Sequence, residues 1–341
     1  MKKHAIAIAV GSLFALPAVA LAGGPTVYGK VNVTYEGIEE TNKDGSTEVD
    51  NWQLQSNDSR LGVKGSFDLD ARDLTAIYGL EFGVDVAEGD ADDGQTIKQR
   101  NIYGGLQHAT MGTFKVGKFD TPFKKAQGDV DQFGDLGGDI KHIAAGENRE
   151  SNILQYTSPK LGDVVTVNVA FMPGEEGEGS DRDGPADSIS SSLVFDNGTF
   201  YGALAYDSEV SDTTYDADLA GLDDDYVDAF RAVGMMNMGN FEFGGLVQTA
   251  ESSEDVSGKT YEDTTTLVSG AYGVDRWKFK AQYGVTDMDQ LDDELSLMAI
   301  GADYKMGKAS KLFAYYSQVE RDETEAEETH LGLGFQHKFS M

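Results

Sequence analysis

Acidic and basic side chains are spread through one long link, residues 120–150, which joins two segments of alternating polarity. With 31 residues it is the longest link in the chain, and a structureless stretch of that length in a compact fold is usually functional. Gly134, Gly137 and Gly138 allow sharp backbone turns within it. Its carboxylates and cations could act on ions and polar solutes through their charge. The charged residues that we single out are Asp120, Lys124, Lys125, Asp129, Asp131, Asp135, Asp139, Glu147 and Arg149.

Catalytic and metal-binding signatures are missing from the sequence. The mature chain has four histidines, and none stands near a serine-nucleophile motif such as G-x-S-x-G; there is no H-E-x-x-H zinc motif and no P-loop. The acidic run that ends at Gly94 lacks EF-hand spacing, because the position five residues earlier is Gly89. We therefore expect no enzyme activity, no cofactor and no metal site. Loose binding of divalent cations by the acidic links remains open.

The composition describes an exported, acidic chain. Lys2 and Lys3 precede an apolar run, and Ala20 and Ala22 stand at positions typical of a cleavage site, which predicts a signal peptide at residues 1–22 and one mature domain at residues 23–341. The net charge is −32, and −34 once the two lysines are removed, which disfavours nucleic acid as a partner. The chain has no cysteine and no later run of apolar residues long enough for a transmembrane helix, so any membrane span must consist of strands.

Alternation of polar and apolar residues with a period of two runs through the mature chain and predicts β-strands. We count about sixteen such segments, with edges uncertain by about two to four residues. They lie at Thr26–Glu36, Ser59–Leu69, Leu74–Val86, Gln99–Ala109, Gly112–Phe119, Ser151–Ser158, Asp163–Met172, Ser188–Asp196, Thr199–Ser208, Val227–Asn237, Asn240–Ala250, Asp263–Gly273, Arg276–Thr286, Glu294–Lys305, Ser310–Val319 and Glu328–Phe339.

The links between these segments alternate in length. Short links alternate with long ones at 37–58, 87–98, 120–150, 173–187, 209–226, 251–262, 287–293 and 320–327. In a meander every second turn lies at the same end of the sheet, so one end carries short turns and the other long loops, as in outer-membrane barrels. Closure would also remove both edges of so long a sheet. The sequence predicts an all-β fold, a transmembrane antiparallel up-and-down β-barrel.

The stretch RWKFKAQYGV at residues 276–285 raises the question of which strand face points inward. No helical segments are available to fill so wide a barrel, so its interior must be water. We therefore predict that Trp277, Phe279 and Tyr283 face lipid, whereas Lys278, Lys280 and Gln282 face the lumen. A soluble sandwich with the opposite orientation is the alternative.

Three stretches resemble the general porins of Gram-negative bacteria, of the sixteen-stranded neisserial and proteobacterial type. TVYGKV at residues 26–31 resembles the first strand of that family, GTFKVGKFDTPF at 112–123 its fifth strand and the exit into the third loop, and GLGFQHKF at 332–339 its last strand. The family normally ends on an aromatic residue that the barrel-assembly machinery recognises. Here Ser340 and Met341 follow Phe339, which puts assembly rather than fold in doubt.

The resemblance implies that the long link is a third loop that folds into the barrel and narrows the lumen. The parity of the early strands places a basic wall, Lys30, Arg60, Lys64 and Lys115, on the lumen side. An acidic loop opposite a basic wall would set up a transverse field that passes water and ions and penalises apolar solutes. Since acids dominate the loops, we expect a general diffusion channel for small hydrophilic solutes with a weak cation preference.

The resemblance also implies partners and a location. We expect a homotrimer in the outer membrane of a Gram-negative bacterium, in contact with lipid and lipopolysaccharide and delivered through its C-terminal strand to the assembly machinery. A substrate-specific channel, to which the inward Tyr28 and Tyr103 would contribute, is one alternative. An adhesin role of the outer loops is the other.

Overall fold

The computed structural model describes residues 24–42, 46–71, 73–87, 96–174, 182–212, 226–253, 262–289, 292–322 and 326–341. The predicted signal peptide and parts of the long acidic links lie outside these ranges. Among the described residues, no helix is long and apolar enough to cross a bilayer.

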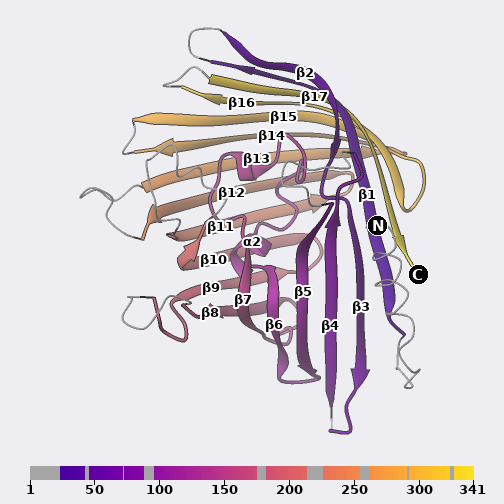
Figure 1. Ribbon diagram of the computed structural model, residues 1–341, viewed down its shortest axis with the longest axis vertical. Coiled ribbons are helices and arrows are strands. Elements are labelled where there is room, and N and C mark those ends of the chain that lie inside the picture. The colour runs from indigo at the N-terminus through magenta and orange to yellow at the C-terminus, as the bar shows by residue number, and fades with distance from the viewer. Residues whose placement is uncertain are drawn as a thin grey trace, which may run out of the picture.

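Seventeen strands form one sheet whose neighbours all pair antiparallel, and Figure 1 shows them following one another around a ring. Two short helices interrupt them, α2 (Pro122–Ala126) and the 3₁₀ helix η1 (Ile140–His142). The strands are β1 (Thr26–Thr41), β2 (Thr47–Ser56), β3 (Arg60–Asp68), β4 (Leu74–Val84), β5 (Ile97–His108), β6 (Gly112–Asp120), β7 (Arg149–Thr157), β8 (Val165–Met172), β9 (Ser188–Asp196), β10 (Phe200–Ser211), β11 (Tyr226–Met238), β12 (Phe241–Ser252), β13 (Glu262–Val274), β14 (Trp277–Met288), β15 (Asp293–Lys305), β16 (Ser310–Arg321) and β17 (Ala326–Ser340).

The barrel nevertheless has sixteen strand positions, because β2 and β3 share one of them. β2 pairs with the second half of β1, from Val33 to Thr41, whereas β3 pairs with its first half, from Thr26 to Lys30. The extended backbone is interrupted between the two strands at Asp58, which has a positive φ of 53°. The predicted strand count and fold class are therefore confirmed.

One predicted link is in part a strand. Residues 37–58 were expected to form a loop, but β1 continues to Thr41 and β2 returns along it. The aromatic ring of Trp52 stacks on that of Tyr35 with 5.1 Å between centroids, and it covers Gly37, where a side chain would collide with the indole. The acids Glu39, Glu40 and Asp50 interrupt the polar-apolar alternation, so the sequence pattern does not predict this hairpin.

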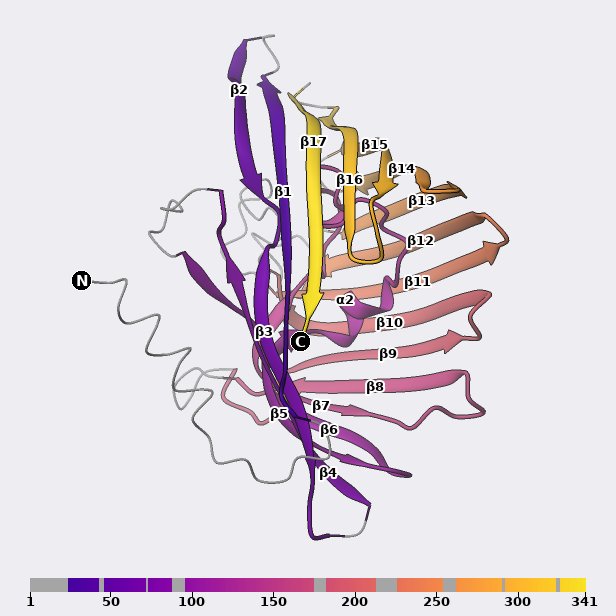
Figure 2. The same ribbon diagram turned by 90° about the vertical axis from the view of Figure 1, so that its right-hand side faces the viewer.

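Closure comes from the pairing of β1 with β17, which runs from Tyr28 opposite Ser340 to Thr41 opposite Glu327. The two residues after Phe339 extend this ladder rather than shifting it. The amide of Met341 donates to the Val27 carbonyl at 2.8 Å, and the Val27 amide donates to the Met341 carbonyl at 3.1 Å. Figure 2 shows β1 and β17 side by side.

The orientation of the strand faces is as predicted. On β14, Trp277 is 45% exposed, Phe279 48% and Tyr283 50%, whereas Lys280 and Gln282 are buried on the opposite, inward face. Aromatic side chains pair across strands on the outside, as Trp277 does with Tyr304 at 4.9 Å between ring centroids. An apolar exterior with buried polar groups inside is the arrangement of a barrel in hydrocarbon.

Candidate pore constriction

The segment 121–148 between β6 and β7 lies inside the ring of strands, and we call it loop 3 (Figure 1, Figure 2). Thr121 begins α2, and its hydroxyl accepts a hydrogen bond from the Lys124 amide at 3.1 Å. Pro122 occupies the first helical position, where its missing amide hydrogen has no consequence. The helix turns the chain away from the barrel end, with Phe123 and Ala126 buried against the wall.

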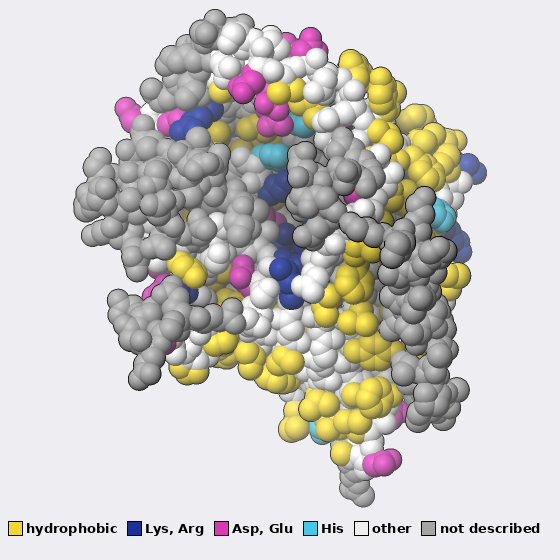
Figure 3. Space-filling view, in the orientation of Figure 1, with side chains coloured by type: hydrophobic (Ala, Val, Ile, Leu, Met, Phe, Trp, Pro, Cys, Tyr) yellow, Lys and Arg dark blue, Asp and Glu magenta, His cyan; other side chains and the backbone are white. Residues whose placement is uncertain are grey.

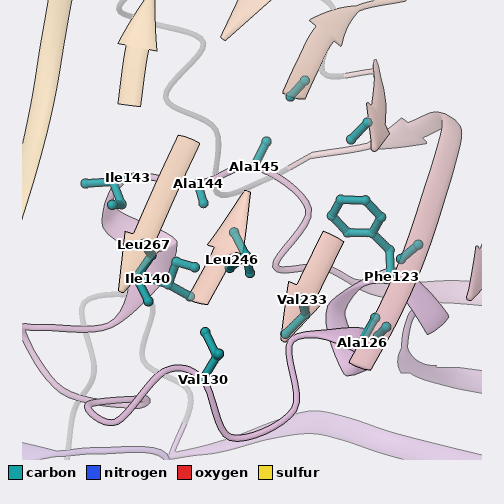
Figure 4. Close-up of a cluster of buried hydrophobic side chains, with 14 of the residues drawn as sticks. Phe123, Ala126, Val130, Ile140, Ile143, Ala144, Ala145, Val233, Leu246 and Leu267 are labelled. Atoms are coloured by element: carbon teal, nitrogen blue, oxygen red, sulfur yellow. The ribbon is translucent and has the colours of Figure 1, made fainter. Parts of the chain in front are cut away.

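Apolar contacts hold loop 3 against one side of the barrel. Phe123, Val130, Ile140 and Ile143 are buried in a single cluster with inward side chains of β10, β11, β12, β13 and β15 (Figure 4). The wall residues in that cluster are Ala203, Ala205, Ala229, Val233, Met235, Leu246, Ala250, Leu267 and Leu297. Much of the lumen face that the loop covers is therefore apolar. A barrel strand would otherwise present polar residues to an aqueous interior.

A buried arginine clamps the two ends of loop 3 together. Arg231 of β11 has no exposed surface, and its guanidinium group stacks over the Phe123 ring at 4.4 Å. Its Nη1 donates to Glu147 Oε1 at 2.8 Å, and its Nη2 donates to the Ala145 carbonyl at 3.0 Å. Gln248 of β12 accepts from Arg231 Nε at 2.7 Å and donates to the same Ala145 carbonyl at 2.9 Å.

The middle of the loop is anchored on β14. Gln282 accepts from the Gln132 amide at 2.8 Å and donates to the Gly138 carbonyl at 2.6 Å. Lys280 donates to the Gln132 carbonyl at 2.6 Å, and its ammonium group lies 4.2 Å from the centre of the Phe133 ring. Further along, Phe133 and Leu136 pack with side chains of β15 and β16.

Two loop carboxylates fold loop 3 on itself. Asp131 accepts from the amides of Phe133 at 2.8 Å and Ile140 at 3.2 Å. Asp139 accepts from the amides of Asp135 at 2.7 Å and Lys141 at 2.9 Å. Burial, reinforced by the charge of Asp139, raises the pKa of Asp131 to about 8.

Asp135 links the loop to the first strand. It forms an ion pair with Lys30 of β1, and it lies beside Asp58, which in turn pairs with Arg100 of β5. Burial raises the pKa of the Asp135 carboxyl, and the positive charge of Lys30 opposes that shift. Arg100 also donates to Glu81 at 3.1 Å, and Glu81 accepts from the Tyr28 hydroxyl at 3.0 Å.

The structure thus shows that most of the predicted loop acids are engaged within the protein. Asp131, Asp135, Asp139 and Glu147 are engaged within the protein, which leaves Asp129 as the exposed acid among the five in the interior of the loop. Asp120 and Arg149 pair with each other at 2.9 Å between Oδ1 and Nη2. Burial raises the pKa of Glu147, while Arg231 acts in the opposite direction.

Of the predicted cations, Lys64, Lys115, Lys124 and Lys125 have no carboxylate at ion-pair distance among the described residues. Lys125 is exposed, and Lys124 donates to a backbone carbonyl, that of Glu147, at 2.7 Å. Lys64 lies 5.1 Å above the Tyr28 ring, and Arg60 stands 3.9 Å from Glu81. Lys115 lies 3.8 Å from the centre of the Phe119 ring. In Figure 3, Lys and Arg side chains run in a column through the hollow of the molecule.

Sequence reasoning missed Arg231 and Gln248, and the signal that marks Arg231 is its parity. It shares the inward face of β11 with Val227, Ala229, Val233 and Met235, so a lone charge stands in an otherwise apolar row. Within the described ranges, no three His, Asp or Glu side chains are grouped so that they could hold a metal ion.

Comparison with known proteins bears on the whole chain. The solved structures that it resembles include an anion-selective porin from Comamonas acidovorans, with a TM-score of 0.76 and 18% identity over 93% of this chain and 99% of that one. The trimer form of OmpT from Vibrio cholerae has a TM-score of 0.66 and 17% identity over 93% of this chain and 100% of that one. Salmonella typhi OmpF in complex with daunomycin has a TM-score of 0.66 and 14% identity over 92% of this chain and 97% of that one. No curated protein sequence matches significantly. The model of one family, described as Gram-negative porin, matches residues 5–324, and the chain therefore belongs to the Gram-negative porin family.

Proposed function

We propose that this chain is a general diffusion channel of the outer membrane, which passes small hydrophilic solutes and ions through a water-filled lumen that loop 3 constricts. The observation that carries the proposal is the docking of loop 3 on the inner wall, at its two ends through the Arg231 clamp and in its middle through the Gln282 contacts. A loop held inside the barrel occupies cross-section that water would otherwise fill. No bond of the solute changes in such passage.

Deleting Asp129–Gly138 tests the constriction. The deletion removes the part of loop 3 that spans β12 to β16, so single-channel conductance in a planar bilayer should rise. A deletion of ten residues from the outer link, 213–222, is the length-matched control and should leave conductance near the wild-type value. Equal conductance of the wild type and the loop 3 deletion would refute the constriction.

The ion preference depends on which charges face water. Acids dominate the sequence of the loops, from which a weak cation preference is predicted. The engagement of Asp135, Asp139 and Glu147 within the protein argues for the opposite sign, because Lys64, Lys115 and Lys125 have no carboxylate at ion-pair distance among the described residues. We infer a preference for anions at the constriction, and the structurally similar Comamonas porin is likewise described as anion-selective.

A reversal potential under a tenfold KCl gradient tests this inference. A sign that corresponds to chloride preference supports it, and a sign that corresponds to potassium preference restores the sequence-based prediction. With 0.1 M KCl on the dilute side, the charges of the outer-loop acids are screened beyond about 10 Å there and more strongly on the concentrated side. The reversal potential therefore reports mainly the constriction.

The assembly is proposed as a homotrimer, in line with the trimer form recorded for the structurally similar OmpT. Chemical cross-linking in detergent should give a ladder that ends at three chains. Lipid, lipopolysaccharide and the assembly machinery are proposed partners on the apolar exterior and the C-terminal strand. Cleavage after Ala22 is proposed as well, and the mass of the protein from outer membranes tests it.

A further inference from the structure

A compact cluster of cations lies where loop 3 leaves the barrel wall. Lys115 of β6, Lys124 and Lys125 of α2 and Arg149 of β7 surround Asp120, the last residue of β6. Asp120 interacts electrostatically with Arg149, Lys124 and Lys125, and Lys115 interacts with Lys125 and Asp120. Four cations therefore lie near one carboxylate.

The single carboxylate of the cluster, that of Asp120, already has partners on both oxygens. Asp120 pairs with Arg149 at 2.9 Å, and its other oxygen accepts from Asn101 Nδ2 at 3.1 Å. The ammonium group of Lys124 donates a hydrogen bond to the Glu147 backbone carbonyl. Lys115 and Lys125 have no carboxylate at ion-pair distance in the described part of the chain, so their charges are available to a solute.

The floor of the cluster is aromatic. Lys115 lies 3.8 Å from the centre of the Phe119 ring and 5.3 Å from that of Tyr103, and these two rings meet edge to face at 6.1 Å. Phe119 is buried with Ile153, Ala170, Met172 and Val210. An apolar floor excludes water from one side of the ammonium group, which strengthens its attraction to an anion on the other side.

The neighbouring acids do not cancel this charge. Glu147 is bound by Arg231, and Glu150 interacts with Lys118. Asp129 is exposed and forms no ion pair with these cations among the described residues. Lys115 and Lys125 are therefore the two cations of the cluster that are left without a paired carboxylate and without a backbone acceptor.

We propose that Lys115 and Lys125 form a saturable site inside the pore for small divalent oxyanions, such as a phosphate or a dicarboxylate, with Lys124 and Arg149 supporting it. Two separate ammonium groups match two negative charges on one solute, whereas a monovalent anion can engage only one of them at a time. Ammonium groups act as point charges rather than as a planar fork, so valence and not shape decides what binds. The site rests on the proposed function, since it requires an open lumen.

Inorganic phosphate at about pH 7.5, where it is mainly divalent, is the probe. Added to a single channel that conducts KCl, it should reduce the chloride current with a saturating dependence on concentration. Acetate at equal concentration should not reduce it. Losing one charge-assisted contact worth about 1.5–3 kcal/mol should raise the half-blocking concentration about tenfold or more in Lys115→Gln and in Lys125→Gln. Lys115→Arg and Lys125→Arg should retain the block.

Lys160→Gln changes an exposed lysine in the turn between β7 and β8 and is the matched control. Phosphate should block this variant at the same concentration as the wild type. A channel that conducts chloride but is not blocked by phosphate, or is blocked equally by acetate, overturns the site and leaves the proposed function standing. Block that survives both Gln substitutions overturns the assignment of the two lysines. Absence of any channel current overturns the proposed function, and the site with it.

Discussion

At the scale of single residues, Arg231 shows how a buried charge can position a loop. Taking a guanidinium group out of water is costly unless its donors are paired. Here the partners are Gln248 on the next strand and Glu147 and Ala145 on the returning end of loop 3, with Phe123 of the outgoing end stacked on top. Because one side chain contacts both ends, the loop can leave the wall only by breaking all of these contacts.

We predict that Arg231→Met loosens loop 3. Glu147 would be left buried without its partner, and breaking a buried ion pair from one side costs about 3–5 kcal/mol. The expected result is a noisier open channel with additional conductance levels in single-channel records. Arg276→Met, an exposed position in the turn between β13 and β14, should behave like the wild type.

The double variant Arg231→Met with Glu147→Leu separates lost charge from lost packing. It removes the unpaired carboxylate, so part of the quiet open state should return. Single-channel noise in Arg231→Met that equals the wild-type noise would contradict the clamp.

The second prediction at this scale concerns pH. Burial raises the pKa of Asp131 to about 8, whereas an unfolded Asp titrates near about 4. A carboxyl whose pKa is raised by folding stabilises the folded loop at low pH, and this contribution is lost as pH rises toward 8. Loop 3 should therefore become more mobile between pH 5 and pH 8, which current noise recorded across that range measures.

Asp131→Asn is the variant that checks the origin of this pH dependence. The amide oxygen keeps one acceptor for the loop amides and cannot titrate. The variant should show flatter noise across the same range, and a slope equal to that of the wild type would assign the effect to another group.

At the scale of elements, the strands were predictable and the docking of loop 3 was not. The period of two placed Trp277 outside and Gln282 inside because strand parity is a local property. Which inward residues the loop would cover depends on the register of strands far apart in sequence, as with Gln282 and Gly138, 144 residues apart. Local patterns therefore gave the loop its length and its glycines but not its partners.

Gly146 permits a prediction about the root of loop 3. It has a positive φ of 86°, and a Cβ at this position would lie 2.3 Å from Phe123 Cε1. Gly146→Ala combines the strain of a left-handed backbone, about 1–2 kcal/mol, with a collision against a ring that Arg231 holds in place. We expect altered conductance and a lower unfolding temperature in detergent.

Gly162→Ala is the matched control for this variant. Gly162 also has a positive φ, of 58°, but nothing lies within 4 Å of its added Cβ. It reports the backbone strain alone, so Gly146→Ala should be the more destabilised of the two. Equal losses would mean that the ring contact contributes nothing.

At the scale of the whole molecule, composition and local charge point in opposite directions. The chain is strongly acidic, yet among the described residues the lumen beside loop 3 carries unpaired lysines, because four of the five acids in the interior of the loop are engaged within it or with the wall. A net charge therefore predicts the exclusion of nucleic acid but not the preference of a channel. Which charges pair with one another follows only from the three-dimensional structure, because a one-residue change of strand register moves a charge from the lumen to the lipid face.

The last prediction concerns closure. Deleting Ser340 and Met341 removes both hydrogen bonds between Met341 and Val27 and leaves Phe339 opposite Gly29 at the end of the ladder. At about 0.5–1.5 kcal/mol for each bond, refolded barrels should lose about 1–3 kcal/mol of stability against unfolding in detergent. Deleting Gly24 and Pro25, which precede β1, removes two residues at the neighbouring terminus and should cost less stability.

Assembly in cells should show the opposite order of the two deletions. Deleting Ser340 and Met341 makes the aromatic Phe339 terminal, and we expect the assembly of this variant into the outer membrane to match or exceed that of the full chain. Lower assembly of this deletion in cells, together with lower stability after refolding, would mean that the two extra residues serve closure alone.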